Sequence, residues 1–307
     1  MIDLPKDGSS MDSLPIAVSG ANGFTGRFVC CELLKRRIPF LAVLRPEANP
    51  SWMLSKKIPL RFADLNNAAQ LGDQLVNCRA LLNVASIGFG AAPSIVKACK
   101  KANIKRAVFV STTSIFTQLN TNSKAIRKAA EEAIKCSGLD ATIMRPTMIY
   151  GTPGDRNMIK LVKWLDRWPI LPVFGKGDYL QQPVHVSDVA WAVVEALNSA
   201  KTINKQFSLT GAAPLTFNQI INLTSQALGR NVYRIHLPAK IFVTLIKKTE
   251  LLGINLPIKA EQIERLNENK AFSHADASKC FGYSPMHFEE GIKQEVALFR
   301  DGRDGVS

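Results

Sequence analysis

Three glycines spaced three residues apart give the chain its clearest chemical signal. Residues 18–29 read "VSGANGFTGRFV", which sets Gly20, Gly23 and Gly26 between an apolar run and a helical pattern. Glycine permits a tight turn and lets backbone N–H groups approach a ligand, and the amino end of a helix favours negative charge. We therefore expect this turn to bind the phosphates of a dinucleotide.

The end of the next apolar run indicates which dinucleotide. The run "LAVLRP" ends in Leu44 and Arg45, with no acid where an NAD site usually binds the ribose hydroxyls. Arg45 together with Arg27 suits a 2′-phosphate better, although Glu47 lies just beyond. We favour NADP(H) and keep NAD(H) as the alternative.

Short apolar runs alternate with longer amphipathic ones from residue 15 to 145, and these elements must position the turn. The six strand candidates read "PIAVSG", "IPFLAVL", "IPLRF", "RALLNVAS", "RAVFVST" and "DATIMRP". This alternation predicts right-handed crossovers and a parallel sheet covered on both faces, hence an α/β fold of the Rossmann-type, doubly wound class. The first helix is expected from Phe24 to about Arg36.

The pattern divides the chain into three regions. Residues 1–14 read as a flexible tail, and residues 15–150 as a dinucleotide-binding domain to which 182–211 contribute strands. The rhythm changes after Gly151, with strand-like "QPVHV" and "QFSLTG" in a mostly helical context. We expect residues 151–307 to form a smaller, mostly helical substrate-binding part.

Composition limits the classes of function. A chain of 307 residues with 46% hydrophobic content can bury a substantial core. Its six cysteines have no metal-ligand spacing, so we expect neither a metal site nor disulfides, and a reducing cytoplasm as the location. The apolar stretch at 239–258 is interrupted by charges, which argues against a transmembrane segment.

The net charge of +14 points to an anionic partner. Most basic residues fit solvated helix faces, and no aromatic-interleaved basic groove indicates nucleic acid. We expect a small-molecule substrate, with an anionic one among the candidates. Contact with a membrane surface or an acidic protein stays open, as does a homodimer.

Several segments, in order along residues 15 to about 230, resemble the short-chain dehydrogenase/reductase superfamily. The resemblance is to its extended and atypical branch, the NAD(P)-dependent epimerases and dehydratases. The segments read "SGANGFTG", "FADL", "LLNVAS", "VFVSTTSIF", "ATIMRPTMIYG" and "QPVHVSDVAWAVVEAL". The resemblance implies hydride transfer on a sugar nucleotide or another carbonyl or hydroxyl substrate.

The turn, the charge argument and the resemblance together suggest a set of cofactor-binding residues. The set is Gly20, Asn22, Gly23, Phe24, Thr25, Gly26, Arg45, Asp64, Leu65, Ala85, Ser86, Ser111, Lys128, Pro146, Thr147 and Met148. By the resemblance, Asp64 and Leu65 edge the adenine, Ala85 and Ser86 line the cofactor groove, and the last three residues lie by the nicotinamide. For Asp64 the alternative is a plain turn carboxylate.

The catalytic residues that the resemblance implies are incomplete. Active members of the family use a hydroxyl residue and a Tyr-x-x-x-Lys pair, in which the lysine lowers the pKa of the phenol and holds the ribose. Thr113 fits the hydroxyl and Lys128 the lysine, with a surface ion pair to Glu132 as the alternative for Lys128. Lys124 stands where the tyrosine should be. A phenol has a pKa near about 10, so it needs a close positive charge to transfer protons at neutral pH.

Substrate recognition also departs from the family. Gln181 and Gln182 precede "PVHV", where nucleotide-sugar enzymes often carry an arginine that clamps a diphosphate. By the resemblance, Asn157 is the residue expected to contact the substrate. His185 fits a packed strand residue better than a catalytic one, because the sequence offers it no triad.

We favour an enzyme, an NAD(P)-dependent epimerase, dehydratase or oxidoreductase. Thr113 would orient the substrate, and Lys124, a water or a residue from the second half of the chain would transfer protons. The alternative is a non-catalytic NADPH-binding sensor or assembly module, because atypical members of the family also lack the tyrosine.

Overall fold

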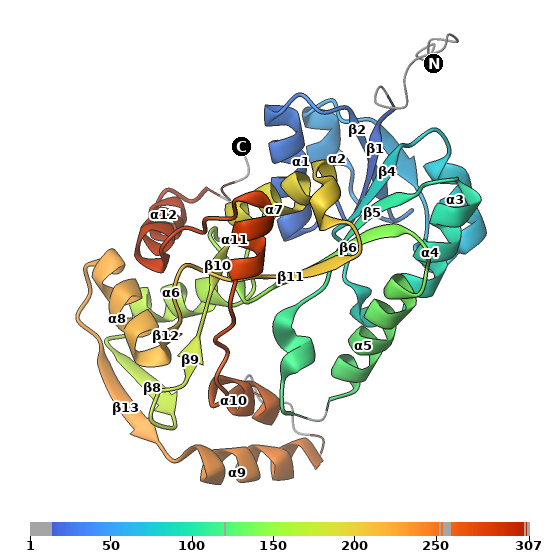
Figure 1. The fold of residues 1–307 in the computed structure, drawn as a ribbon. Helices are drawn as coiled ribbons and strands as arrows, with labels where there is room; N and C mark the ends of the chain where they lie inside the picture. Colours follow the sequence, from blue (N-terminus) through green and yellow to red (C-terminus); the bar gives the residue numbers. More distant parts are fainter. Residues whose placement is uncertain (1–13, 120, 252, 254–258, 304, 306–307) are drawn as a thin grey trace. The chain divides into compact units, whose positions relative to one another are not determined.

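A computed structural model describes residues 14–119, 121–251, 253, 259–303 and 305 (Figure 1). The predicted tail, except for Leu14, lies outside the described residues. The chain divides into two compact units. Unit 1 comprises residues 1–111, 122–144 and 190–206, and unit 2 comprises residues 112–121, 145–189 and 207–307.

A seven-stranded parallel sheet confirms the predicted Rossmann-type fold. Its strand order is β11-β6-β5-β4-β1-β2-β3, so the order reverses beside β1. Ile16 of β1 pairs with Phe40 on one side and with Ala80 on the other. The strands are β1 (Ile16–Ser19), β2 (Phe40–Leu44), β3 (Leu60–Phe62), β4 (Ala80–Asn83), β5 (Arg106–Val110), β6 (Asp140–Pro146) and β11 (Lys205–Leu209).

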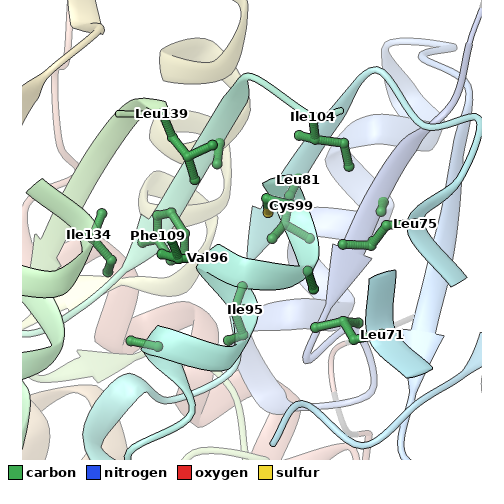
Figure 2. Close-up of a cluster of buried hydrophobic side chains, with 14 of the residues drawn as sticks. Leu71, Leu75, Leu81, Ile95, Val96, Cys99, Ile104, Phe109, Ile134 and Leu139 are labelled. Carbon is green, nitrogen blue, oxygen red and sulfur yellow. The ribbon is translucent and has the colours of Figure 1, made fainter. Parts of the chain in front are cut away.

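Helices cover both faces of this sheet. They are α1 (Phe24–Lys35), α2 (Ser51–Ser55), α3 (Ala68–Leu75), α4 (Ala92–Lys101), α5 (Asn122–Lys135) and α7 (Val186–Asn198), with 3₁₀ turns η2 (Ile87–Phe89) and η4 (Ala200–Thr202). Helix α3 packs on α4 and α4 on α5. Their apolar side chains meet those of the strands in one buried cluster that includes Leu81, Ile95 and Phe109 (Figure 2). The first helix has the predicted extent.

Unit 2 combines short strand pairs with helices, around a core that includes Tyr150, Val162 and Ile292. The pairs are β7 (Ile149–Tyr150) with β10 (Val184–His185), β8 (Ile170–Phe174) with β13 (Tyr233–Leu237), and β9 (Leu180–Gln181) with β12 (Leu215–Thr216). The helices are η3 (Thr113–Phe116), α6 (Met158–Arg167), α8 (Phe217–Leu228), α9 (Ala239–Leu251), α10 (Ala260–Leu266), α11 (Ala275–Phe281) and α12 (Phe288–Arg300). The strand expected over 182–186 is limited to β10, because α7 begins at Val186.

Among the described residues, no helix has the length and apolar character needed to cross a bilayer. The same part of the chain contains no group of three or more histidine, cysteine or acidic side chains arranged to hold a metal ion.

Glu295 on α12 is a fully buried carboxyl in unit 2. One of its oxygens accepts a hydrogen bond from the N–H of Gly151 at 3.1 Å, and the other finds no donor among the described residues. Burial raises the pKa of Glu295 to about 10, and the carboxyl of Asp155 adds to this shift. Asp155 itself accepts hydrogen bonds from the N–H groups of Asn157 and Ile159 at the start of α6. Glu295 is therefore protonated at neutral pH in the folded chain.

The substitution Glu295→Gln should remove a pH dependence of stability. The folded chain keeps the Glu295 proton up to a pKa of about 10, whereas the ordinary value for this carboxyl is 4.5. The stabilisation present below the lower pKa is therefore lost as the pH rises towards the higher one, with a slope of up to about 1.4 kcal/mol per pH unit. Glutamine keeps an acceptor for Gly151 and offers an N–H donor to Asp155. Urea unfolding of the variant from roughly pH 5 to 9 should therefore lack this slope.

Glu289→Gln is the matched control, because Glu289 lies on the same helix but is exposed and pairs with Lys293 at 2.6 Å. Its stability should follow the wild-type slope over the same pH range. Parallel pH profiles for the wild type and Glu295→Gln would contradict the assignment.

Candidate functional site

The carboxyl edge of the unit 1 sheet gathers most of the predicted cofactor residues. Gly20 follows β1, Arg45 follows β2, Asp64 comes soon after β3, Ala85 soon after β4, and Ser111 follows β5. Because the strands are parallel, their carboxyl ends meet at one edge, and ligands of such sheets bind where the strand order reverses. Here that place is between β1 and β4.

The turn after β1 packs closely against the residues that follow β4. Gly20 has a φ of +73°, and a Cβ on it would overlap the backbone N of Ala85 and lie 2.7 Å from its Cα. Gly26 is buried, and a Cβ there would overlap the carbonyl oxygen of Gly20 and lie 2.7 Å from that of Ala21. Glycine is therefore required at both positions by backbone contact, independently of any ligand.

The buried side-chain amide of Asn83 stabilises this contact by hydrogen bonds. The hydroxyl of Ser19 donates to Oδ1 of Asn83 at 2.7 Å, and Nδ2 of Asn83 donates to the carbonyl of Ala85 at 2.9 Å. Asn83 is fully buried at the end of β4. It thus ties the ends of β1 and β4 to the loop against which Gly20 packs.

The amino end of α1 suits a phosphate group. Gly23 occupies the N-cap position without a capping side chain, it is exposed, and the first turn contains no acid. Thr25 and Phe24 lie in this first turn, where backbone N–H groups point out of the helix. The helix end therefore offers a backbone cradle of positive potential.

The neighbouring Asn22 is engaged within the protein. Its Nδ2 donates to the carbonyl of Asn49 at 2.8 Å, and its Oδ1 accepts from Arg27 at 2.9 Å. The Arg27 guanidinium also lies over the ring of Trp52, 5.4 Å from its centroid. Arg45, by contrast, is exposed at the end of β2.

The loop after β3 has a local structural role. Oδ1 of Asp64 accepts hydrogen bonds from the backbone N–H and the side chain of Asn66, at 2.9 and 3.2 Å. This is the turn role that the sequence left as the alternative for Asp64, and its contact with adenine stays a prediction. Leu65 packs against the core cluster of unit 1.

The inner face of α5 carries different residues from those expected. Lys128 is exposed, and Lys124 is partly buried. Arg127 instead packs on η2, where a Cβ on Gly88 would lie 2.9 Å from its Nε. Its position is next to Ser86, whose hydroxyl accepts the N–H of Gly88 at 3.2 Å.

Glu131 helps to fix the rotation of α5 about its axis. It is 2% exposed and accepts a hydrogen bond of 2.6 Å from the hydroxyl of Ser111, at the end of β5. Ala130, Glu131 and Ile134 together form the buried face of α5, and this face directs Arg127 rather than Lys128 inward. The sequence interpretation missed Arg127. The apolar face of the helix, which includes Ala130 and Ile134, could have indicated that Arg127 points inward.

In unit 2 the predicted hydroxyl lies at the start of η3. Thr113 is 6% exposed, and its Oγ1 donates to the carbonyl of Pro146 at 3.4 Å. Thr147 donates its hydroxyl to the carbonyl of Gln182, and Met148 is partly buried. The hydroxyl of Ser114 is buried and has no hydrogen-bond partner among the described residues. A buried hydroxyl without a partner is a candidate ligand contact. The sequence did not single out Ser114.

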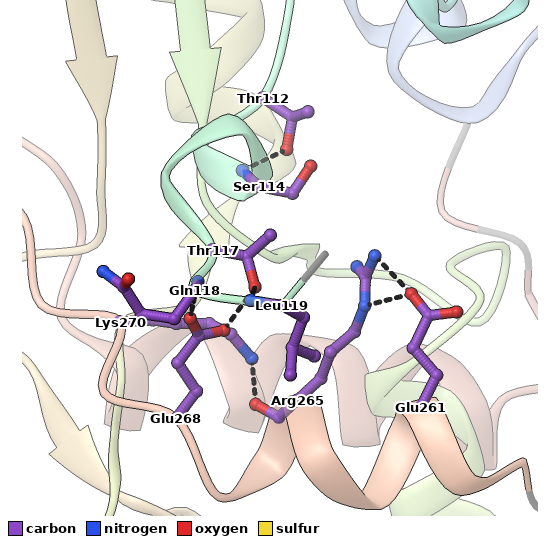
Figure 3. A network of polar contacts seen from close by, with 9 residues as sticks. All are labelled: Thr112, Ser114, Thr117, Gln118, Leu119, Glu261, Arg265, Glu268 and Lys270. Carbon is purple, nitrogen blue, oxygen red and sulfur yellow. Dashed lines mark hydrogen bonds and ion pairs between the residues drawn. The ribbon is translucent and has the colours of Figure 1, made fainter. Parts of the chain in front are cut away.

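A polar network holds the segment after η3 (Figure 3). The carboxylate of Glu268 accepts the hydroxyl of Thr117 at 2.7 Å and the N–H of Gln118. Lys270 donates to the carbonyl of Arg265 and to Oε1 of Gln181 at 3.3 Å. Burial lowers the pKa of Lys270 to about 8, which brings its proton transfer near neutral pH.

Asn157, the predicted substrate contact, differs in exposure from Gln182 and His185, the other two residues that the sequence singled out in this part of the chain. Asn157 is exposed at the start of α6. Gln182 is 4% exposed and donates to Thr210 at 3.0 Å and to the carbonyl of Gly211 at 2.9 Å. His185 is buried, and burial lowers its pKa to about 4, so it is neutral in the folded chain at physiological pH.

The buried tyrosines are not suited to proton transfer near neutral pH. Tyr150 and Tyr283 are buried, and burial raises the pKa of both, opposite to the shift that proton transfer near neutral pH requires. Tyr179 and Tyr233 are exposed, and both lie far along the chain from the helix that should carry the phenol.

Comparison with known proteins identifies the fold and the class of cofactor. A family model described as NAD(P)H-binding matches residues 20–200. NADH dehydrogenase (ubiquinone) 1 alpha subcomplex subunit 9, mitochondrial, of Arabidopsis thaliana is 24% identical over 287 residues, covering 86% of this chain and 71% of the relative. A ceramide reductase of Caulobacter vibrioides is 25% identical over 236 residues, covering 73% of each protein.

Solved structures share the same architecture. UDP-glucose 4-epimerase from Thermotoga maritima, crystallised with UDP-glucose, superposes with a TM-score of 0.74 at 16% identity, covering 94% of this chain and 99% of the epimerase. At this identity the likeness concerns the fold alone.

Gly26→Ala should destabilise unit 1, because its Cβ overlaps the Gly20 carbonyl. We expect the free energy of unfolding to fall by about 1–3 kcal/mol, measured by urea denaturation. Gly23→Ala is the control: this residue is exposed, with a φ of −74°, and its Cβ would lie 3.2 Å from the nearest atom. It should remain within about 1 kcal/mol of the wild type. Equal losses in the two variants would show that the turn is not packed as described.

Proposed function

This chain belongs to the NAD(P)H-binding family, and on that premise we propose that it uses NADP(H) to transfer hydride to and from a carbonyl or hydroxyl substrate. The observation that carries the proposal is the glycine turn held against Ala85, which presents the uncapped amino end of α1. Bound there, the cofactor's nicotinamide would supply or accept the hydride. Six free cysteines support a reducing cytoplasm as the location, and a homodimer stays a prediction.

The preference for NADP(H) rests on Arg45. It is exposed at the end of β2, a position suited to a guanidinium that pairs with a 2′-phosphate. Arg27 contributes less than the sequence suggested, because its guanidinium already binds Asn22 and lies over Trp52. Titration with NADPH and NADH in parallel tests the preference, and tighter binding of NADH would contradict it.

We assign Arg127 the cofactor contact that the family pattern gives to a lysine. Its side chain packs over Gly88, in the turn that follows Ala85 and Ser86, and so reaches the cofactor edge of unit 1. A guanidinium offers several fixed donors to ribose hydroxyls or phosphate oxygens, and it keeps its charge at all accessible pH values. Lys128, on the exposed side of the same helix, lacks this placement.

Arg127→Ala should therefore weaken NADPH binding, whereas Lys128→Ala should not. We expect the dissociation constant, measured by nucleotide fluorescence, to rise about tenfold for Arg127→Ala, the loss of about 1.4 kcal/mol. Lys128→Ala removes one positive charge from the neighbouring position and serves as the control. The reverse ranking of the two variants would return the contact to Lys128.

The substrate contacts of unit 2 favour a carbonyl compound over a diphosphate sugar. The hydroxyls of Thr113 and Ser114 are neighbours on η3, and the Ser114 hydroxyl has no partner among the described residues. Gln182 stands where a phosphate-clamping arginine would be, and its amide is occupied by Thr210 and Gly211. The reductase among the relatives also favours a carbonyl substrate.

A non-catalytic NADPH-binding module is the second candidate. It is favoured because burial raises the pKa of Tyr150 and Tyr283, which is the wrong direction for proton transfer near neutral pH. Neither Ser123, four residues before Arg127, nor Lys124, four before Lys128, supplies a phenol. A relative named as a subunit of NADH dehydrogenase supports it. For an enzyme, proton transfer would fall to Lys124, to a water or to Lys270, whose pKa is lowered to about 8.

Turnover by the wild type separates the two candidates, and Thr113→Val tests the role of the hydroxyl. If the chain is an enzyme, loss of the orienting hydroxyl should lower kcat by about 10²-fold while the NADPH dissociation constant stays unchanged. Turnover is followed by NADPH absorbance with a panel of 3-oxoacyl compounds, other ketones and sugar nucleotides. Tight NADPH binding by the wild type without oxidation of the nucleotide by any of them would favour the module.

A further inference from the structure

One face of the strand pair β8–β13 in unit 2 is apolar and exposed. The two strands are parallel, with Tyr233 opposite Ile170 and Ile235 opposite Pro172. Since side chains alternate along a strand, Leu171 points to the other face, where it is buried in the core of unit 2. Ile170, Tyr233 and Ile235 are between 47% and 72% exposed. The end of this face at Ile170, Tyr233 and Ile235 is therefore exposed, whereas α9 covers Phe174 at its other end.

Helix α9, which follows β13 directly in Figure 1, continues this character. Phe242 and Ile246 point inward, where they join a small core with Phe174 and Ile263. The opposite face of α9 presents apolar side chains to solvent. They are Ile241, Leu245 and Leu251, which are 65%, 55% and 86% exposed. This is the pattern of a helix with one buried and one solvent-facing apolar stripe.

Along this part of the chain, basic residues outnumber acidic ones, although two of the basic residues pair with acids of other elements. Residues 230–251 contain five basic residues and one acid, Glu250. The basic residues are Arg230, Arg234, Lys240, Lys247 and Lys248. Lys247 pairs with Glu264 at 2.6 Å, and Arg230 lies 3.7 Å from Asp166. Lys240 and Lys248 are exposed near Ile241 and Leu245 on the helix.

We propose that these residues, Ile170, Tyr233, Ile235, Ile241, Leu245 and Leu251 with the lysines of α9, form a docking surface for an anionic lipid bilayer. Apolar side chains enter the interfacial layer, while lysine side chains reach the acidic headgroups. Exposed aliphatic residues and tyrosine beside basic residues are the combination that binds such interfaces. An anionic bilayer complements both the charge and the apolar character of the surface, and the proposal is independent of cofactor binding.

The test is sedimentation of the 307-residue chain with lipid vesicles. The wild type should bind vesicles of phosphatidylcholine with phosphatidylserine about tenfold more strongly than vesicles of phosphatidylcholine alone, and high salt should weaken this binding. The double variant Ile241→Ser/Leu245→Ser should lose about tenfold in partitioning. Lys240→Glu/Lys248→Glu should lose binding to the acidic vesicles.

Controls keep the result interpretable. Leu54→Ser changes a residue of α2 in unit 1 that is 59% exposed, and it should bind vesicles like the wild type. Thermal unfolding and NADPH binding should be unchanged in the α9 variants, because the substituted side chains are exposed. No binding of the wild type to acidic vesicles at low salt would overturn the proposal. So would a wild-type dimer that the α9 substitutions dissociate, since it would give the surface to a second copy of the chain.

Discussion

The backbone contact between the turn after β1 and the loop after β4 is the constraint on which unit 1 depends. Gly20 lies so close to Ala85 that no side chain fits between them, and Gly26 lets the first turn of α1 approach Gly20 equally closely. Asn83 satisfies the polar groups that this contact buries. Packing alone thus fixes the amino end of α1 beside the centre of the sheet.

This placement determines the electrostatic character of the edge. The first turn of α1 contains no acid and no capping side chain, so the positive potential of the helix end is not neutralised within the helix. Arg45 adds positive charge on one side, while Arg127 approaches from α5 on the other. The local charges favour an anionic ligand much more directly than the net charge of +14 does, since most lysines lie on exposed helix faces.

Unit 2 contains fewer of the groups that proton transfer to a substrate would require. Unit 2 supplies buried hydroxyls on η3 and holds the following segment through Glu268. It also contains Lys270, whose pKa falls with burial. It offers no phenol suited to proton transfer among the described residues, because burial raises the pKa of Tyr150 and Tyr283. A reductase with altered proton transfer and a binding module without turnover are both compatible with this architecture.

The sequence by itself determined the parallel sheet and the glycine turn, because these depend on residue types at local spacings. Only the tertiary structure decided which basic residue of α5 faces inward. Arg127 and Lys128 are adjacent and chemically similar, so the sequence could not separate them. The choice depends on the rotation of the helix, which is set by the burial of Ala130 and Ile134 and by the hydrogen bond of Glu131 to Ser111 on a distant strand. Likewise, the turn role of Asp64 and the occupied amide of Gln182 arise from partners that folding brings near.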